Sequence, residues 1–351
     1  MSTIKWCLSV GGIVAAVAGF ATHSSGQDAG KASAAAAAIA KDPSRPAPTA
    51  SNAPPAESTA DGYRLVWHDE FDKDGPLNPA DWAYEQGFVR NQELQWYQPE
   101  NAVCKDGFLV IEARKESKPN PRYAAPDTSG GTDQGGRGGG RRWQNRPTIE
   151  VTSASITTRG KHSWLYGRFE IRAKIDTRSG SWPAFWTLGT QGRWPACGEV
   201  DIMEYFGNNV LANVAWAGKP GGAPNPNGAT WNSVRQPLRT LPANWADQFH
   251  TWRMDWDSTS IKLFLDDKQV NDQDLSKTIN TSRGRGAPEN PFVEGGAYII
   301  LNQAIGGQAG GDPSHTEFPV RFLVDYVRVW QKPAAQTGAD NISRAPPVSK
   351  E

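Results

Sequence analysis

Short segments in which apolar and polar residues alternate recur along the middle of the chain. In the clearest of them, residues 166–175, Phe169, Ile171, Ala173 and Ile175 alternate with charged residues. A period of two is typical of a β-strand with one buried and one solvated face. Similar segments bounded by Gly, Pro and Asn predict roughly a dozen strands and an all-β sandwich or barrel. The strands are expected at 65–67, 108–113, 148–158, 182–188, 199–205, 210–216, 250–256, 261–265, 297–304 and 322–331.

The two ends of the chain lack this alternation and are predicted to lie outside the folded domain. Residues 1–26 have the pattern of a secretory signal: Lys5 precedes an apolar run that is short for a membrane span of about 20 residues. An uncleaved anchor is the alternative. Residues 27–61 are rich in Ala, Pro and Ser and residues 333–351 are polar, which predicts a disordered linker and a disordered tail. The folded domain is therefore expected at 62–332.

One segment inside this domain also departs from the pattern. Residues 116–147 contain a stretch, 130–142, that consists mostly of Gly, Arg, Gln and Asp. Because such a composition supplies no apolar core, it predicts a flexible Gly/Arg surface loop inserted in the domain. An RNA-binding Gly/Arg segment is the alternative, which the predicted export of the chain disfavours.

Composition narrows the class of partner. The chain carries 37 basic and 37 acidic residues, so it has no net charge, which argues against a nucleic-acid partner and against binding to a membrane surface. The chain has 15 Trp residues, whose flat faces suit stacking on sugar rings, although Trp also fills cores. After the predicted signal, Cys104 and Cys197 remain. They predict either a disulfide in an exported protein or two buried thiols.

Three carboxylates lie close together in the segment Gly198–Tyr205. In a regular strand Glu199 and Asp201 share one face, whereas Glu204 lies on the other. One extra residue at Ile202–Met203, a β-bulge, brings Glu204 back to the face of the other two. Three unpaired carboxylates are very costly to bury in a core. We therefore predict that all three face a cleft or a metal ion.

Two carboxylates on either side of a sugar–sugar bond can hydrolyse it. In the retaining reaction they lie about 5–5.5 Å apart, and one is the nucleophile while the other acts first as acid and then as base. A third acid between them helps to hold the charges in different protonation states. A calcium site on the three acids is the alternative, but one strand supplies few of the roughly six to eight oxygens required. Zinc is disfavoured because no His lies near this strand.

The acidic segment and its surroundings resemble a known family. Glu199-Val200-Asp201-Ile202-Met203-Glu204 is similar to the bulged active-site signature of glycoside hydrolase family 16, in its laminarinase-like branch. The resemblance covers about 62–332, because further motifs of the family recur in order. They are Trp67-His68-Asp69-Glu70-Phe71-Asp72, Trp182-Pro183-Ala184-Phe185-Trp186, Trp194-Pro195-Ala196-Cys197-Gly198, the segment 252–256, Leu301-Asn302-Gln303-Ala304-Ile305-Gly306-Gly307 and Val324-Asp325-Tyr326-Val327-Arg328-Val329.

This resemblance implies a β-jelly-roll sandwich of two antiparallel sheets with a concave substrate cleft. It implies retaining endo-hydrolysis of β-linked polysaccharide, foremost β-1,3- or mixed β-1,3/1,4-glucan. By position, Glu199 is then the nucleophile, Glu204 the general acid/base and Asp201 the helper between them. A galactan hydrolase of the agarase, porphyranase or carrageenase type and a transglycosylase of the same fold are the alternatives. A non-catalytic carbohydrate-binding module is more remote, because such relatives usually lose one of the glutamates.

The resemblance also implies residues that contact the polysaccharide. One difference from the family lies on the strand after the acidic one, where many laminarinases carry a His and this chain has Asn213-Val214-Ala215-Trp216. The linkage that is cut therefore stays open. The expected substrate-binding residues are Asn101, Arg159, Trp182, Trp186 and Trp194.

A structural calcium ion is implied on the convex side of the sandwich. Glu70 and Asp325, with the carbonyl group of Gly107, resemble its ligands, whereas catalysis is expected to need no cofactor. The mature protein is expected to be a secreted monomer whose partner is a polysaccharide, with no nucleic-acid or membrane partner.

Overall fold

The computed structural model describes residues 55–124, 143–218, 228–281 and 286–333. This part of the chain consists of strands, loops and short 3₁₀ turns, and it contains no α-helix. Among these residues, no helix has the length and apolar character needed to cross a membrane. The expected secretory signal at 1–26 and the Gly/Arg stretch at 130–142 lie outside the described residues.

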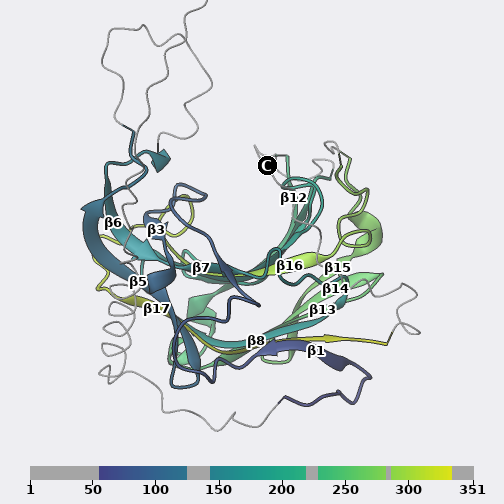
Figure 1. The fold of residues 1–351 in the computed structure, drawn as a ribbon. Helices are drawn as coiled ribbons and strands as arrows, with labels where there is room; N and C mark the ends of the chain where they lie inside the picture. Colours follow the sequence, from purple (N-terminus) through teal and green to yellow (C-terminus); the bar gives the residue numbers. More distant parts are fainter. Residues whose placement is uncertain (1–54, 125–142, 219–227, 282–285, 334–351) are drawn as a thin grey trace, which may run out of the picture.

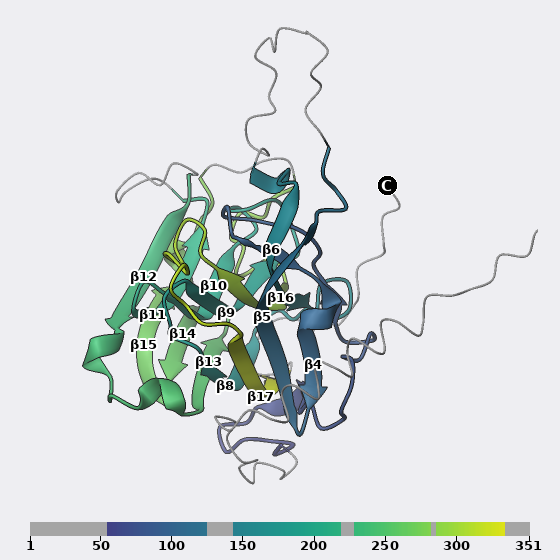
Figure 2. The same ribbon diagram turned by 90° about the vertical axis from the view of Figure 1, so that its left-hand side faces the viewer.

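Seven strands form a curved sheet whose concave face carries the acidic segment. In Figure 1 this sheet forms the floor and the right-hand wall of a trough, with β12 at the right. The left-hand wall comes from β3 and β6 of the other sheet. Figure 2 shows β12, β11, β10, β9 and β16 side by side. In order across the sheet the strands are β12 (Thr230–Pro237), β11 (Asn209–Trp216), β10 (Glu199–Phe206), β9 (Ser181–Gly189), β16 (Ala297–Ile305), β7 (Ser155–Thr157) and β2 (Ala83–Tyr84).

A ten-stranded sheet packs behind the first. Its strands pair antiparallel except β3 and β6, which are parallel; β1 pairs with β17, and β4 pairs with β5. The remaining order is β15 (Lys268–Asp274), β14 (Ser260–Leu265), β13 (His250–Trp256), β8 (Gly167–Ile175), β17 (Val320–Gln331), β5 (Phe108–Pro119), β6 (Thr148–Ser153) and β3 (Gln95–Tyr97), with β1 at Arg64–Asp69 and β4 at Ala102–Lys105. The 3₁₀ turns are η1 (Pro99–Asn101), η3 (Leu238–Thr240), η4 (Trp245–Asp247) and η5 (Leu275–Lys277).

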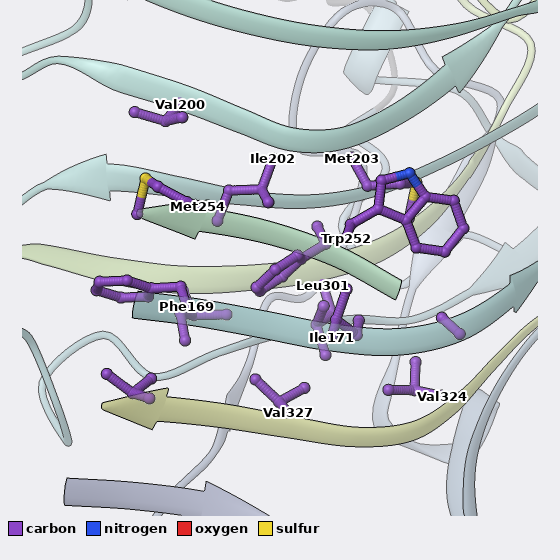
Figure 3. Close-up of a cluster of buried hydrophobic side chains, with 14 of the residues drawn as sticks. Phe169, Ile171, Val200, Ile202, Met203, Trp252, Met254, Leu301, Val324 and Val327 are labelled. Carbon is purple, nitrogen blue, oxygen red and sulfur yellow. The ribbon is translucent and has the colours of Figure 1, made fainter. Parts of the chain in front are cut away.

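The core lies between the two sheets and is apolar. On β8 the side chains alternate between buried and half-buried, as the period of two predicted. Figure 3 shows Phe169 and Ile171 of β8 in one cluster with Trp252 of β13 and with Ile202 and Met203 of β10. A fully buried side chain of this size stabilises the fold by about 1.5–3 kcal/mol. The two stacked sheets confirm the predicted all-β jelly-roll sandwich.

Some predicted boundaries were wrong because tertiary pairing decides them. The single strand expected at 148–158 is two strands, β6 and β7, which belong to different sheets and are separated at Ala154. Strand β5 runs on to Pro119, so the loop expected at 116–147 begins later. Strand β12 (Thr230–Pro237) was not among the predicted strands.

The domain also begins earlier than expected. Ser58 forms a β-bridge with Arg64, and the indole N–H of Trp330 donates a hydrogen bond to the carbonyl of Ala56. Residues 55–61, which were assigned to the linker, therefore belong to the fold, whereas the rest of the expected linker and the tail beyond 333 lie outside the described residues.

Candidate active site

The acidic strand contains the predicted bulge. On β11 the partner of Asp201 is Asn213 and the partner of Glu204 is Leu211, so two residues of β10 lie opposite one residue of β11. The two residues are Ile202 and Met203, and both are fully buried in the core. Because two successive side chains point inward, Glu204 returns to the concave face that Glu199 and Asp201 share.

All three carboxylates line one groove on the concave face. The groove has a volume of about 860 Å³, and its walls come from β9, β10, β11, β12 and β16 and from the segment 90–93. Trp182, Trp186 and Trp194 line it as well. The carboxylates therefore face a cleft and not the core, as their desolvation cost required.

Each of these indoles is held by a hydrogen bond, and two of them hold an acid. Trp194 donates from Nε1 to Oε2 of Glu199 over 2.8 Å, and Trp182 donates from Nε1 to Oε1 of Glu204 over 2.8 Å. Trp186 instead donates to Oδ1 of Asn302. Each bond fixes the plane of a large flat ring against the groove and, at the two glutamates, the orientation of the carboxyl group.

Asn213 links two of the acids. Its Nδ2 donates to Oδ2 of Asp201 over 2.9 Å and to Oε2 of Glu204 over 3.0 Å, and the residue is only 3% exposed. The sequence analysis mentioned this strand only because it lacks the His that many laminarinases carry there, and it predicted no role for Asn213. The register of the β10–β11 hairpin, which turns at Gly207 and Asn208, is the signal that places Asn213 opposite Asp201.

Burial raises the pKa values of all three acids, and so does the charge of neighbouring acids at Glu199 and Glu204. Burial raises the pKa of Asp201 to about 6, against a hydrogen bond from Asn213 that lowers it. Burial, and then the neighbouring charges of Asp201 and Glu204, raise the pKa of Glu199 well above its usual value. Burial and the charge of Asp201 do the same for the pKa of Glu204. The site can therefore keep a proton on one carboxyl group near neutral pH while another is ionised.

The substitution Asn213→Ala is expected to lower kcat/KM about 10- to 100-fold, because hydrogen bonds to charged groups contribute about 1.5–3 kcal/mol each. The pKa values of Asp201 and Glu204 are expected to rise further without their donor, so the pH–rate profile moves to higher pH. A pH series of kcat/KM measures both effects. Asn209→Ala, on the same strand outside the groove, is the control, and an unshifted profile in Asn213→Ala would contradict the assignment.

One end of the groove is lined by a network of polar and charged side chains. Asn91 and Glu93 both belong to the lining. Glu93 is 2% exposed and accepts hydrogen bonds from Gln95 and from the hydroxyl of Tyr97. Arg90, which was not predicted, places its guanidinium 5.2 Å from the centre of the Trp186 ring. One face of Trp186 is thereby covered.

Two predicted substrate-binding residues do not line the groove. Asn101 is fully buried in η1, where its amide donates to the carbonyl of Glu112 and to the hydroxyl of Thr152. Its hydrogen bonds therefore support the join between these strands. Arg159 is exposed, with its guanidinium 5.7 Å from the centre of the Tyr298 ring.

The residues expected to bind calcium do not fit a calcium site. Both oxygens of Glu70 accept hydrogen bonds from Arg328, over 2.9 and 2.7 Å, and Asp325 accepts one from Arg172. Gly107 lies in the turn between β4 and β5 with a φ of 78°. Within the described ranges no group of three or more His, Cys, Asp or Glu residues could hold a metal ion. Because arginines already neutralise both carboxylates, the calcium site stays a prediction without support.

Chelation is therefore expected to leave the thermal stability unchanged. A calcium site at 100 times its Kd would stabilise the protein by about 2.7 kcal/mol, which corresponds to a Tm higher by several degrees in a domain of this size. Melting curves in excess calcium and in excess chelator measure the difference. A clear fall of Tm in chelator would restore the calcium site.

The two cysteines of the domain are not bonded to each other. Cys104 and Cys197 are both buried free thiols, and burial raises the pKa of Cys104 to about 12 and that of Cys197 to about 11. The disulfide interpretation was therefore wrong, and the buried-thiol interpretation is confirmed.

The sequence of the chain is similar to those of known proteins. A model described as "Glycosyl hydrolases family 16" matches residues 93–292. A beta-glucanase from Rhodothermus marinus is 35% identical over an alignment 295 residues long, which covers 77% of this chain and 85% of that protein.

Solved structures share the fold. A structure from work on endo-acting O-glycanases of the human gut microbiota has a TM-score of 0.65 at 32% identity and covers 79% of this chain and 94% of its own. A LamA variant from Z. galactanivorans, solved with laminaritriose and laminaritetraose, has a TM-score of 0.56 at 29% identity and covers 76% and 98%. With its bulged acidic strand, its two-sheet fold and this family match, the chain belongs to glycosyl hydrolase family 16.

Proposed function

We propose that the protein is a retaining endo-β-glucanase that cleaves β-1,3- or mixed β-1,3/1,4-glucan. The observation that carries the proposal is the bulge in β10, which brings Glu199, Asp201 and Glu204 to one groove. The names of two relatives, a beta-glucanase and a LamA solved with laminari-oligosaccharides, support glucan as the substrate.

The proposed reaction has two steps. In the first, ionised Glu199 attacks the anomeric carbon and forms a glycosyl ester, while protonated Glu204 gives its proton to the glycosidic oxygen as that bond breaks. In the second, Glu204 removes a proton from water, and the water oxygen attacks the same carbon and releases Glu199. The Trp194 and Trp182 indoles orient the two carboxyl groups, and Asp201 with Asn213 supports Glu204.

The shape of the groove supports cleavage inside a polymer chain. Its lining extends from β12 at one edge of the sheet across β10 to β16 and the segment 90–93. A polysaccharide can therefore lie across the strands with sugars on both sides of the acids. The faces of Trp182, Trp186 and Trp194 suit the apolar faces of these sugars.

A galactose-containing glycan chain is the second candidate substrate. The structure from work on O-glycanases that initiate mucin breakdown has a higher TM-score, 0.65, than the LamA complex, 0.56. The strand after the acids also lacks the His that the laminarinase-like resemblance predicts. A transglycosylase differs only in the second step, in which a sugar hydroxyl replaces water.

A substrate panel separates these proposals. The full chain is incubated with laminarin, lichenan, agarose, porphyran and mucin O-glycans, and the products are sized and their anomeric configuration is followed. We expect short β-glucan oligosaccharides that retain the configuration of the cleaved bond. Inversion would exclude the covalent intermediate, longer products would indicate transglycosylation, and cleavage of a galactan alone would replace the glucan proposal. Export through residues 1–26 and the monomeric state stay predictions.

A further inference from the structure

The edge strand β12 presents three side chains to the groove. Trp231, Ser233 and Arg235 alternate along the strand and therefore share one face, and all three line the groove. Trp231 is 36% exposed. An exposed indole in a groove is unusual, because Trp in a folded domain is normally buried or hydrogen-bonded.

The strand register places these residues beside the acids. Trp231 pairs with Ala215, which pairs with Glu199. Arg235 pairs with Leu211, which pairs with Glu204. Two strand spacings of about 4.8 Å put each β12 residue about 10 Å from its acid. That distance is too large for contact with the reacting atoms and reaches a neighbouring sugar.

The direction of the substrate follows from the acids. Glu199 and Glu204 lie along β10, and in a retaining reaction they act on opposite sides of the cleaved bond. The sugar chain must therefore run across the strands, so one of its two arms passes over β11 and β12. This step rests on the proposed function.

The surface over β11 and β12 offers the groups that recognise a sugar. The rings of Trp194 and Trp231 lie with their centres 6.4 Å apart at 50°, so they form an angled aromatic wall. Asn213 Oδ1 is buried and has no hydrogen-bond partner among the described residues. Within the described part of the chain Arg235 makes no hydrogen bond or ion pair, and its guanidinium lies 5.7 Å from the centre of the Phe206 ring.

A buried acceptor without a partner is costly unless a ligand supplies the donor. A sugar hydroxyl can donate to Asn213 Oδ1, and other hydroxyls can accept from Arg235, while the apolar ring face lies on an indole. We propose that β11 and β12 form a binding subsite for a neutral pyranose next to the cleaved bond, with Trp231 as its stacking residue and Arg235 and Asn213 as its polar contacts.

The test compares Trp231→Ala with Trp231→Phe in the full chain. Tyr123→Ala is the matched control, because Tyr123 is also an exposed aromatic residue, 40% exposed, and does not line the groove. A stacked aromatic contributes enough to binding that its loss should raise KM for the polymer about tenfold, with kcat changed less than about threefold. Trp231→Phe should restore KM to within about threefold of the parent, and Tyr123→Ala should match the parent.

The affinity of catalytically inactive variants for oligosaccharides gives a second measurement. In a Glu199→Gln background, titration with laminari-oligosaccharides should show an affinity about tenfold weaker when Trp231→Ala is added. An unchanged KM and an unchanged affinity would overturn the subsite. A fall in kcat alone would also overturn it, because it would mean that Trp231 acts only by positioning Trp194 against Glu199.

The results that would contradict the subsite differ from those that would contradict the proposed function. A parent enzyme that cleaves neither laminarin nor lichenan contradicts the proposed function, and the same variants are then compared on the polysaccharide of the panel that the parent does cleave. A rise of KM there still supports the subsite. A parent that cleaves glucan, with Trp231→Ala indistinguishable from it, contradicts the subsite alone.

Discussion

Glu199→Gln is expected to abolish hydrolysis of β-glucan, with a loss of at least about 10⁴-fold in kcat, while the fold and sugar binding persist. The amide has nearly the shape of the carboxyl group and can still accept the hydrogen bond that Trp194 donates to Glu199, but it is too weak a nucleophile to form the glycosyl ester. Initial rates on laminarin or lichenan measure the loss. Near-normal activity would show that the nucleophile is another residue.

The same substitution is expected to raise stability at neutral pH. Burial raises the pKa of Glu199 in the folded protein, so the folded state binds this proton more tightly than the unfolded chain does. Wild-type stability therefore falls as pH rises from the ordinary glutamate pKa towards the raised value, and the loss is complete above it. The glutamine variant lacks this loss, so its Tm should exceed that of wild type at neutral pH and converge with it in acid.

A control separates this effect from a general effect of removing a charge. Glu57 is exposed, and Glu57→Gln should leave both the rate and the Tm at neutral pH close to those of wild type. Equal Tm values for Glu199→Gln and wild type from acid to neutral pH would contradict the claim that burial of ionised Glu199 destabilises the folded protein. Loss of rate together with a higher Tm is the pattern expected of a residue kept for function at the expense of stability.

Glu204→Gln is expected to have the second-largest effect, and its size should depend on the substrate. Natural polymer needs a proton on the departing sugar oxygen, so the loss there should be about 10²- to 10⁴-fold. An oligosaccharide with a dinitrophenyl leaving group needs no such proton, so its first step should be largely spared. Comparison of kcat/KM on the two substrates measures the difference, and equal losses would contradict the role of general acid.

The pH profile gives an independent check of the same assignment. The alkaline limb on polymer should reflect loss of the proton that Glu204 donates, and the raised pKa of Glu204 moves this limb above the range of an ordinary glutamate. When Glu204→Gln acts on the dinitrophenyl substrate, its pH–rate profile should have no such alkaline limb, because the titrating group is absent. An alkaline limb that persists in this variant would have to come from the titration of another group.

Much of the site could be predicted from local sequence. The odd spacing between Glu199 and Glu204 requires a bulge if both acids are to face one cleft, and the register confirms it. The alternation at 166–175 predicted β8 because one of its faces is buried against the other sheet.

Other parts of the site could not be predicted, because they depend on partners far away in the chain. Strand β12 shows no alternating apolar face, since its alternate residues Trp231, Ser233 and Arg235 line a groove instead of a core. The roles of Asn213 and Arg90 appear only when β11 lies beside β10 and when the segment 90–93 covers Trp186. Asn101, which the family resemblance placed in the groove, is buried where strands meet.

Alternation and spacing along the chain are enough to predict that this protein is built of strands and that three acids share one face towards a cleft. Both patterns are local properties of a strand, and desolvation forbids burying bare charges. The side chains that meet those acids, in contrast, depend on how the strands pair and curve in the folded domain. Strand register and sheet curvature bring together residues that lie far apart in the chain, and no local pattern specifies these pairings. The indole donors, the bridging Asn213 and the β12 wall of the groove all arise in this way.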